Sequence, residues 1–172
     1  AVGKGTVVAA LTKRFPTLNV SISATTRDPR PGELNGVHYY FVSTKEFDAM
    51  IERGDMLGWA LVHGKNKYGT PRGPVDEALA AGKPVLLEID LAGARQVRTT
   101  RPDAQFIFLA PPSWEELEHR LIGRGTESPE EQARRLTTAR VELEAASEFD
   151  HVVINDDVER AVDELARLIG LE

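Results

Sequence analysis

Lysine and glycine open the chain in an arrangement that suits phosphate binding. Residues 1–6 read AVGKGT, with Lys4 between Gly3 and Gly5 and with Thr6 next. In the loop pattern G-x-x-x-x-G-K-[ST], backbone N–H groups and a helix N-terminus hold phosphates, and the lysine adds a positive charge. The first glycine of that pattern would lie before the printed sequence, and Gly5 stands where a hydroxyl residue usually follows the lysine. This motif alone fits two interpretations equally: the back half of a phosphate-binding loop, or the polar start of a helix.

Arginines gather in two further parts of the chain. ATTRDPRPGE (24–33) places two of them and a glutamate among stiffening prolines, namely Arg27, Arg30 and Glu33. HRLIGRG (119–125) and ARRL (133–136) contain four more, namely Arg120, Arg124, Arg134 and Arg135. Guanidinium groups match phosphate oxygens in pairs and stay charged at physiological pH. A single arginine is more often a solvated surface residue, but the clustering favours anion binding.

Composition limits the classes of function. The 172 residues include 41% hydrophobic residues, enough for one globular domain with a substantial core. The formal net charge of -6 argues against a general nucleic-acid or membrane-surface binder. The absence of cysteine fits a reducing compartment, and no apolar run approaches the roughly 18 residues of a membrane span. We therefore expect a cytoplasmic protein, and, because the chain does not begin with Met, we expect a first strand and the front of the loop to precede it.

The second half of the chain alternates strand and helix patterns. The apolar runs VLLEID (85–90), FIFLA (106–110) and VVIN (152–155) are typical of strands buried on both faces of a parallel sheet. Ser113 with Glu116 predicts one helix start, and so do Ser128-Pro129 and Glu131. A last helix is expected over about 158–169, ending at Gly170. This order predicts an α/β fold with a doubly wound parallel sheet flanked by helices.

Residues 28–72 have a different pattern. A turn-rich stretch is followed by VHYYFV (37–42), a capping box at Ser43 and Glu46, GWALV (58–62) and then a loop rich in glycine and lysine. Short strands around one small helix predict an inserted α+β subdomain.

Taken together, these segments resemble the guanylate kinases, notably the bacterial ones, which are P-loop nucleoside monophosphate kinases. The matching stretches are AVGKGT, SISATTRDPRPGELNGVHYYFV, YGTPRGPV, VLLEIDLAGARQV, FIFLAPPSWEELEHRLIGRGTES and VVINDD, in family order and over essentially the whole chain. The resemblance implies one domain with three parts: a P-loop core (1–27, 73–112 and 136–172), a GMP-binding insert (about 28–72) and a helical lid (about 113–135). It also implies ATP-dependent phosphorylation of GMP, and of dGMP, to the diphosphate in purine nucleotide metabolism. Partners would be GMP, GDP, ATP and ADP, with neither nucleic acid nor membrane, and the oligomeric state stays open.

The resemblance also assigns roles to particular residues. Those implied for GMP are Ser23, Arg27, Arg30, Glu33, Tyr39, Tyr68, Thr70 and Asp90. Those implied for ATP are Val2, Gly3, Lys4, Gly5, Thr6, Arg120, Arg124 and Asn155. Those implied for catalysis are Lys4, Arg27, Arg124 and Arg135. Mg²⁺ accompanies ATP in the family, and Thr6 and Asp90, the latter through water, match its neighbourhood.

Alternatives stay open at several of these positions. Tyr39 lies in an alternating strand pattern and fits a core residue, while Asp90 at a strand end fits a helix cap. Gly58 stands where the family usually has a glutamate that accepts hydrogen bonds from guanine, so guanine selection would fall on Thr70, Asp90 or Asp55. HGKNKYGT (63–70) is one residue longer than the usual family loop. The alternatives to a GMP kinase are a nucleoside monophosphate kinase of altered base preference and a non-catalytic binding domain of the same fold.

Overall fold

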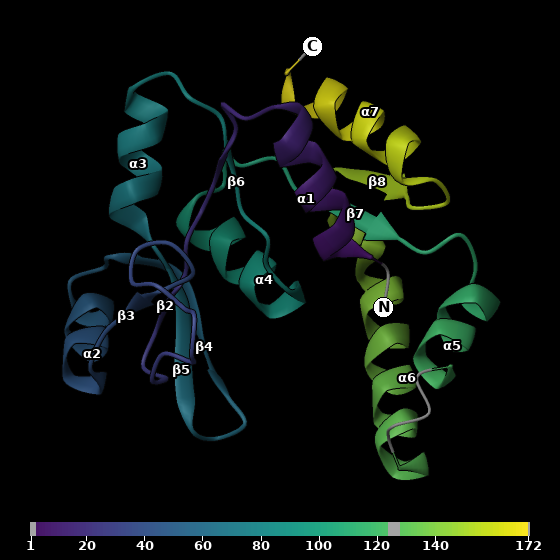
Figure 1. Ribbon diagram of the computed structural model, residues 1–172, viewed down its shortest axis with the longest axis horizontal. Helices are drawn as coiled ribbons and strands as arrows, with labels where there is room; N and C mark the ends of the chain where they lie inside the picture. Colours follow the sequence, from purple (N-terminus) through teal and green to yellow (C-terminus); the bar gives the residue numbers. More distant parts are fainter. Residues whose placement is uncertain (1–2, 124–127, 172) are drawn as a thin grey trace. The chain divides into compact units, whose positions relative to one another are not determined.

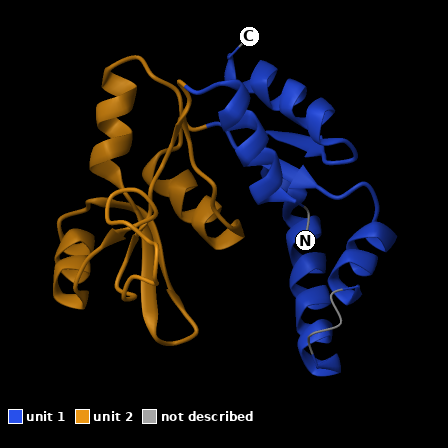
Figure 2. Cartoon of the chain, in the orientation of Figure 1, with its two compact units in different colours: residues 1–16, 105–172 blue, residues 17–104 orange. Residues whose placement is uncertain are grey.

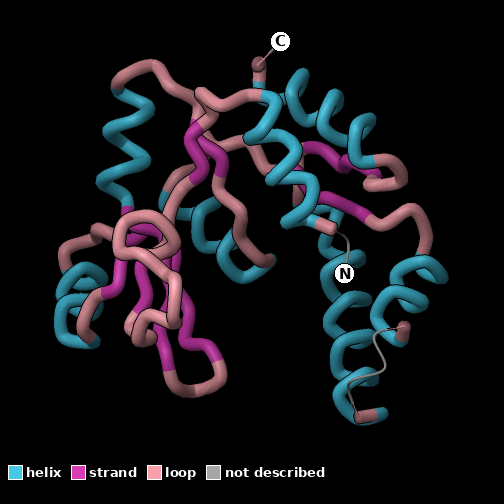
Figure 3. The backbone as a smooth tube through the Cα atoms, in the orientation of Figure 1, coloured by secondary structure: helices cyan, strands magenta, loops and turns pink. Residues whose placement is uncertain are grey.

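A computed structural model describes residues 3–123 and 128–171. By their contacts these residues form two compact units, unit 1 (1–16 and 105–172) and unit 2 (17–104), which are coloured separately in Figure 2. Strands in the described residues make three sheets: a parallel pair in unit 2, a four-stranded sheet in unit 2, and a parallel pair in unit 1. Figure 3 shows the helices and strands along the chain.

Unit 1 packs two helices on a parallel pair of strands (Figure 1). Its elements are α1 (Lys4–Arg14), β7 (Ile107–Ala110), α5 (Trp114–Ile122), α6 (Pro129–Glu144), the 3-10 turn η1 (Ala145–Glu148), β8 (His151–Ile154) and α7 (Val158–Ile169). One apolar face of α7, made by Ala161, Val162, Leu165 and Ala166, is buried. Helix α1 packs on α7 and buries Val7 and Leu11. The N-terminal lysine motif is thus anchored through α1.

Unit 2 is built around a mixed sheet with strand order β3-β2-β5-β4. Its elements are β1 (Asn19–Val20), β2 (Ala24–Thr25), β3 (Tyr40–Phe41), α2 (Thr44–Glu52), β4 (Met56–Val62), β5 (Asn66–Pro71), α3 (Arg72–Ala80), β6 (Val85–Leu86) and α4 (Leu91–Thr100). Ala24, Phe47 and Met56 form a buried cluster, so α2 closes over the sheet beside the β2 strand end. That strand end carries Arg27.

The helix starts follow the sequence signals. Ser43, Ser113 and Ser128 each accept a hydrogen bond from the backbone N–H three residues later, which confirms these predicted N-caps. Gly170 ends α7 in the left-handed conformation (φ 87°), as expected.

The strands differ from the sequence expectation. The sequence predicts one doubly wound parallel sheet, but within residues 3–123 and 128–171 the parallel pairings are spread over three sheets: β1–β6, β7–β8, and β2–β3 inside the four-stranded mixed sheet. The run 85–90 gives only the two-residue β6, because its partner β1 is itself two residues long. The prediction that both faces are buried is also wrong for β8. Val153 is fully buried, but Val152 and Ile154 are 46% and 45% exposed, because successive side chains of a strand point to opposite faces.

The expected loop after GWALV contains a second strand instead. β4 and β5 form an antiparallel hairpin around a turn at His63 and Gly64. Both have positive φ (54° and 65°), as in type I′ turns, which suit the twist of a hairpin. Because His63 is not a typical residue for that conformation, the composition of the segment did not indicate the hairpin.

No helix in the part of the chain that the structure describes is long and apolar enough to cross a membrane.

Candidate functional site

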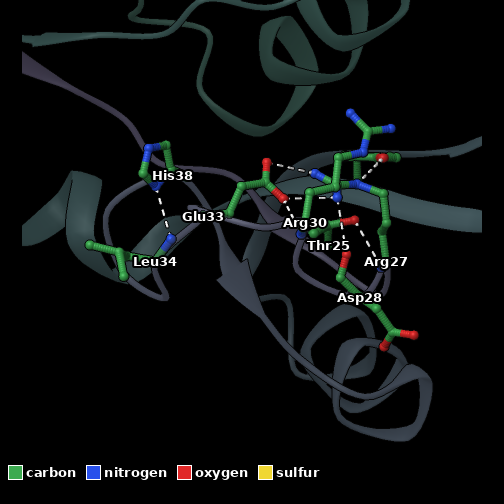
Figure 4. Close-up of polar contacts among 8 residues, drawn as sticks. Thr25, Arg27, Asp28, Arg30, Glu33, Leu34 and His38 are labelled. Atoms are coloured by element: carbon green, nitrogen blue, oxygen red, sulfur yellow. Dashed lines mark hydrogen bonds and ion pairs between the residues drawn. The ribbon is translucent and has the colours of Figure 1, made fainter.

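Arg27 is the centre of a polar cluster at the end of β2. Its backbone N–H donates to Thr25 Oγ1 (3.2 Å), and the side chain is only 12% exposed. Nη1 and Nη2 donate to the two carboxylate oxygens of Glu33 (2.9 and 3.0 Å) (Figure 4). Nε donates to the Tyr68 hydroxyl (3.1 Å). The guanidinium carbon lies 5.3 Å from the centre of the Tyr39 ring. Arg27 is therefore held on three sides.

The turn between Arg27 and Glu33 explains how the two side chains meet. Arg30, Pro31, Gly32 and Glu33 form a tight turn in which Gly32 has a φ of 87° and the Glu33 N–H donates to the Arg30 carbonyl (3.0 Å). Proline at the second position and a positive-φ glycine at the third are the signature of a type II turn. The Arg30 N–H in turn donates to the Glu33 carboxylate (2.7 Å), so two hydrogen bonds join the first and last residues of the turn.

The charges of this cluster support one another. Hydrogen bonds from Arg27, and then from the Arg30 backbone, lower the pKa of Glu33 to about 2. The Glu33 carboxylate in turn raises the pKa of Arg27 above its ordinary value. Arg30 contributes a further positive charge beside Glu33, with an exposed side chain. The cluster thus combines two guanidinium groups with one carboxylate, and it keeps a net positive charge.

The tyrosines predicted for GMP lie together at Arg27. The Tyr39 and Tyr68 rings are 5.9 Å apart, edge to face, and Tyr68 lies on β5 opposite Thr25. Tyr39 is half-buried against Arg27, so it is not simply a core residue. Ser23 lies just before β2, and its carbonyl accepts the Tyr40 N–H (2.9 Å). Unit 2 therefore brings five of the eight residues predicted for GMP, Arg27, Arg30, Glu33, Tyr39 and Tyr68, into one cluster.

The residues predicted for the base lie on β5 and α4. Thr70 is buried (4% exposed) and pairs with Gly58 across the β4–β5 hairpin. Asp90 is the N-cap of α4, where Oδ1 accepts the Gly93 N–H (2.8 Å), so the capping interpretation is confirmed for that oxygen. The Asp55 carboxylate is taken by Arg53 (2.8 Å) and is a poorer candidate for the base than Thr70.

Gln96 joins α4 to β4, and no sequence motif marks it for that role. Its side-chain amide accepts the Trp59 N–H and donates to the Trp59 carbonyl, both at 2.7 Å, and so extends the edge of β4 with a side chain of α4. A Cβ at Gly58 would lie 3.2 Å from Gln96 Cβ and 3.3 Å from its Oε1. A side chain at position 58 would therefore crowd Gln96, which lies close against β4 at this glycine.

Unit 1 holds the residues predicted for ATP. Gly3 has a φ of 78° and precedes α1, whose first turn has no side-chain cap. The positive φ of Gly3 favours glycine, and a Cβ there would lie 2.8 Å from Asn155 Nδ2, so that side chain would have to shift. Asn155 is 6% exposed and follows β8, while Lys4, Gly5 and Thr6 are exposed on the first turn of α1. The motif and Asn155 are thus brought together.

The lid arginines lie on two helices. Arg120 on α5 pairs with Glu116 one turn earlier (3.4 Å), and Arg135 is exposed on α6. The guanidinium carbon of Arg140 of α6 lies 4.5 Å from the centre of the Trp114 ring of α5, an interhelical contact that no sequence motif predicts. Val2 and Arg124, which were also predicted to contact ATP, lie outside the described residues.

Known proteins match this arrangement along the whole chain. A sequence model of the family "Guanylate kinase" matches residues 1–172. A guanylate kinase of Thermobifida fusca is 60% identical over 169 residues (98% of this chain, 86% of the relative), and that of Cutibacterium acnes is 58% identical over 171 (99% and 86%). The crystal structure of guanylate kinase from Anaplasma phagocytophilum superposes with a TM-score of 0.74 at 32% identity, covering 97% of this chain and 80% of that one. Because the family model matches the whole chain and relatives of about 58–60% identity cover nearly all of it, the chain belongs to the guanylate kinase family.

Proposed function

We propose that the protein transfers the terminal phosphoryl group of ATP to GMP, giving ADP and GDP. The observation that carries the proposal is the family match over residues 1–172, which includes every segment predicted to touch a nucleotide. The non-catalytic alternative is not favoured, because the similar relatives bear the name guanylate kinase.

The acceptor side of the reaction falls to unit 2. The phosphate of GMP carries close to two negative charges near pH 7, because its second pKa is about 6. It is therefore already a nucleophile, and no general base has to remove a proton. What it needs is a rigid cationic partner, which Arg27, Arg30 and the Tyr68 hydroxyl supply in our proposal.

The donor side falls to unit 1. The uncapped N–H groups at the start of α1 and the positive end of its helix dipole suit the phosphates of ATP, and Lys4 adds a mobile charge. Arg120 and Arg135, with Arg124 between them in sequence, neutralise the charge that spreads over the transferred phosphoryl group. Asn155 lies near the adenine in this assignment.

Mg²⁺ is part of the proposal. In the described residues no three His, Cys, Asp or Glu side chains gather around a point that could hold a metal ion. Mg²⁺ that is bound to a nucleotide usually takes only one or two protein ligands, and phosphates and water supply the others. We propose the Thr6 hydroxyl as a protein ligand of this ion, and the family resemblance also implies Asp90, through water. When bound, the ion neutralises phosphate charge and orients the terminal phosphates.

The finer architecture also remains proposed. We assign the core to 1–27, 73–112 and 136–172, the GMP-binding insert to 28–72, and the lid to 113–135, with a P-loop sheet as in the family. We further propose that the lid arginines reach the donor phosphates when nucleotide is bound, and that the protein acts in the cytoplasm.

Acceptor choice is the most direct test. A coupled assay with MgATP would compare GMP, dGMP, AMP and UMP at equal concentrations. GMP should give the highest kcat/KM, with dGMP next. Because Gly58 supplies no carboxylate, the preference for GMP over AMP rests on Thr70 and Asp90. Equal or better turnover of AMP or UMP would contradict the assignment to GMP, and no turnover of any acceptor would contradict kinase activity.

A further inference from the structure

The two edges of the Arg27 guanidinium have unlike partners. At its end, Nη1 and Nη2 each donate one N–H to Glu33, and the second N–H of Nη1 goes to the Asp28 carbonyl (3.0 Å). At its side, Nε donates to the neutral Tyr68 hydroxyl. The second N–H of Nη2 has no partner among residues 3–123 and 128–171, and by the covalent geometry of the group it lies beside Nε–H. The side edge is thus the one with donor capacity left.

Tyr68 extends that edge. Its hydroxyl oxygen accepts the Arg27 Nε–H, so its own proton is left to donate to another acceptor. The outer Nη2–H of Arg27 and the Tyr68 O–H are therefore two donors next to each other. An oxygen-rich anion such as a phosphate is the ligand that such a pair suits.

Glu33 is fully engaged within the protein. Its carboxylate accepts both Arg27 nitrogens and the Arg30 backbone N–H, and its own N–H closes the turn on the Arg30 carbonyl (Figure 4). Its side chain is 18% exposed. A negative group at this position repels a phosphate, so a direct substrate contact would be unfavourable while these bonds last.

We propose that Glu33 is a positioning residue: it holds the end of the Arg27 guanidinium so that the side edge, together with the Tyr68 hydroxyl, receives the phosphate of the acceptor nucleotide. This role rests on the proposed function for the identity of the ligand. It replaces the direct GMP contact that the family resemblance implied for Glu33. Glu33 acts through Arg27 and through the turn at Arg30, and it does not touch the reacting atoms.

Charge and position make opposite predictions for Glu33→Gln. The substitution removes a negative charge next to an anion site, so charge alone would tighten GMP binding. Glutamine, however, offers one acceptor oxygen in place of two and turns an N–H donor toward Arg27. If position governs binding, GMP binding weakens in spite of the more favourable charge.

Calorimetry of GMP binding decides between these signs. We expect E33Q to raise the Kd for GMP about tenfold and to leave the Kd for ATP within about twofold of the original. Asp28→Asn is the matched control: the Asp28 carboxylate points away from Arg27 in Figure 4, and in the described residues only its backbone carbonyl bonds to that side chain. D28N should bind GMP as well as or better than the original protein. GMP binding by E33Q at the original Kd or tighter would overturn the proposal.

Coupling to Arg27 separates positioning from a general structural effect. In an Arg27→Ala background, E33Q should change the Kd for GMP less than about twofold, because the group that it orients is gone. An unchanged tenfold effect in that background would contradict action through Arg27. If E33Q does not fold, Glu33→Asp serves instead: it keeps the charge but is one methylene shorter, and it should raise the Kd about threefold. A Kd for E33D equal to the original would then overturn the proposal.

A measurement without nucleotide keeps the two proposals distinguishable. In ¹H–¹⁵N spectra of arginine Nη–H groups, which Glu33 holds in the structure, the Arg27 signal, identified by its loss in Arg27→Lys, should exchange slowly with solvent. It should exchange fast in E33Q and slowly in D28N. Slow exchange in E33Q would contradict the positioning role even if the protein proves to bind no GMP. If the Arg27 signal exchanges slowly in the original protein and fast in E33Q, but the protein does not phosphorylate GMP, only the proposed function would be contradicted.

Discussion

The residues that we propose for the acceptor and those that we propose for the donor lie in different surroundings. In unit 2, Arg27 is 12% exposed and is fixed by Glu33, Tyr68 and the Tyr39 ring. In unit 1, Lys4, Gly5, Thr6 and Arg135 are exposed, and α1 begins without a side-chain cap. The proposed acceptor side is therefore organised by contacts among its own side chains, whereas the proposed donor side offers backbone N–H groups and exposed long side chains.

This difference has a physical reason. A phosphate monoester offers few groups for a protein to contact, so the affinity of the protein for it depends on hydrogen-bond donors that are already in place. ATP has a base, a sugar and three phosphates, and its larger binding energy can organise exposed side chains on arrival. Substitutions should accordingly act through side-chain geometry in unit 2 and through backbone geometry at the start of α1.

The largest effect is expected for Arg27→Ala. It removes the guanidinium on which the acceptor cluster is built and leaves the Glu33 carboxylate without its main partner. We expect kcat/KM for GMP to fall about 100-fold or more, with KM for ATP nearly unchanged. Steady-state kinetics with each substrate varied in turn would measure both. Arg53→Ala, which breaks an exposed ion pair with Asp55 in the same unit, is the control and should stay near the original rate. A loss of less than threefold for Arg27→Ala would remove it from the site.

Gly3→Ala tests the backbone side of the comparison. Alanine at a φ of 78° is strained, and its Cβ would lie 2.8 Å from Asn155 Nδ2. We expect the free energy of unfolding to fall by about 1–3 kcal/mol and ATP affinity to fall with it, while GMP affinity is kept. Urea denaturation and calorimetry would measure these quantities.

Gly5→Ala is the matched control for that strain. Gly5 lies within α1, and a Cβ there would meet nothing within 4 Å. Alanine should leave stability unchanged or raise it by up to about 1 kcal/mol. If the Gly3→Ala and Gly5→Ala variants were equally stable, the left-handed backbone at position 3 would not require glycine.

Local signals account for what the sequence predicted well. The serine caps at Ser43, Ser113 and Ser128 and the glycine at Gly170 act within three or four residues, so their types alone settle the helix ends. The grouping of Arg27 with Arg30 was also visible, because both follow one strand within a short stretch. The R-P-G-E type II turn could have been predicted in addition, since proline and glycine occupy the positions that it requires.

Contacts between distant residues account for what the sequence did not predict. Gln96 meets the Trp59 backbone 37 residues away, and no motif marks a glutamine for that role. The Glu33–Arg27 pair depends on the direction in which the turn sends its side chains, which residue types alone do not show. The length of the strand at 85–90 was predicted wrongly for the same reason, because only Val85 and Leu86 pair with β1.

Gln96→Ala tests a smaller feature of the acceptor side. It removes two hydrogen bonds and leaves the N–H and C=O of Trp59 without their side-chain partner. We expect the free energy of unfolding to fall by about 2 kcal/mol, together with weaker selection of GMP over AMP, because Gly58 and Thr70 lie on the hairpin that Gln96 holds. Gln132→Ala on α6 is the control, with an expected change within about 0.5 kcal/mol. Equal losses for the two variants would show that the α4 contact adds nothing specific.

The smallest effect near neutral pH is expected from the charge of Glu33. Its pKa is lowered from 4.5 to about 2 in the folded protein, first by the Arg27 hydrogen bonds. A lowered folded-state pKa stabilises the protein fully above the unfolded value of 4.5, and this stabilisation is lost as the pH falls from there through about 2. The free energy of unfolding of the original protein should therefore drop more steeply below pH 4.5 than that of E33Q, whereas from pH 6 to 8 the two curves should run parallel.

Because GMP itself gains a proton near pH 6, any weakening of its binding just below that pH should occur equally in both proteins. Parallel stability curves down to pH 2 would mean that Arg27 and Glu33 do not hold each other in solution, and the contrast between a side chain-organised acceptor side and a backbone-organised donor side would lose its main support.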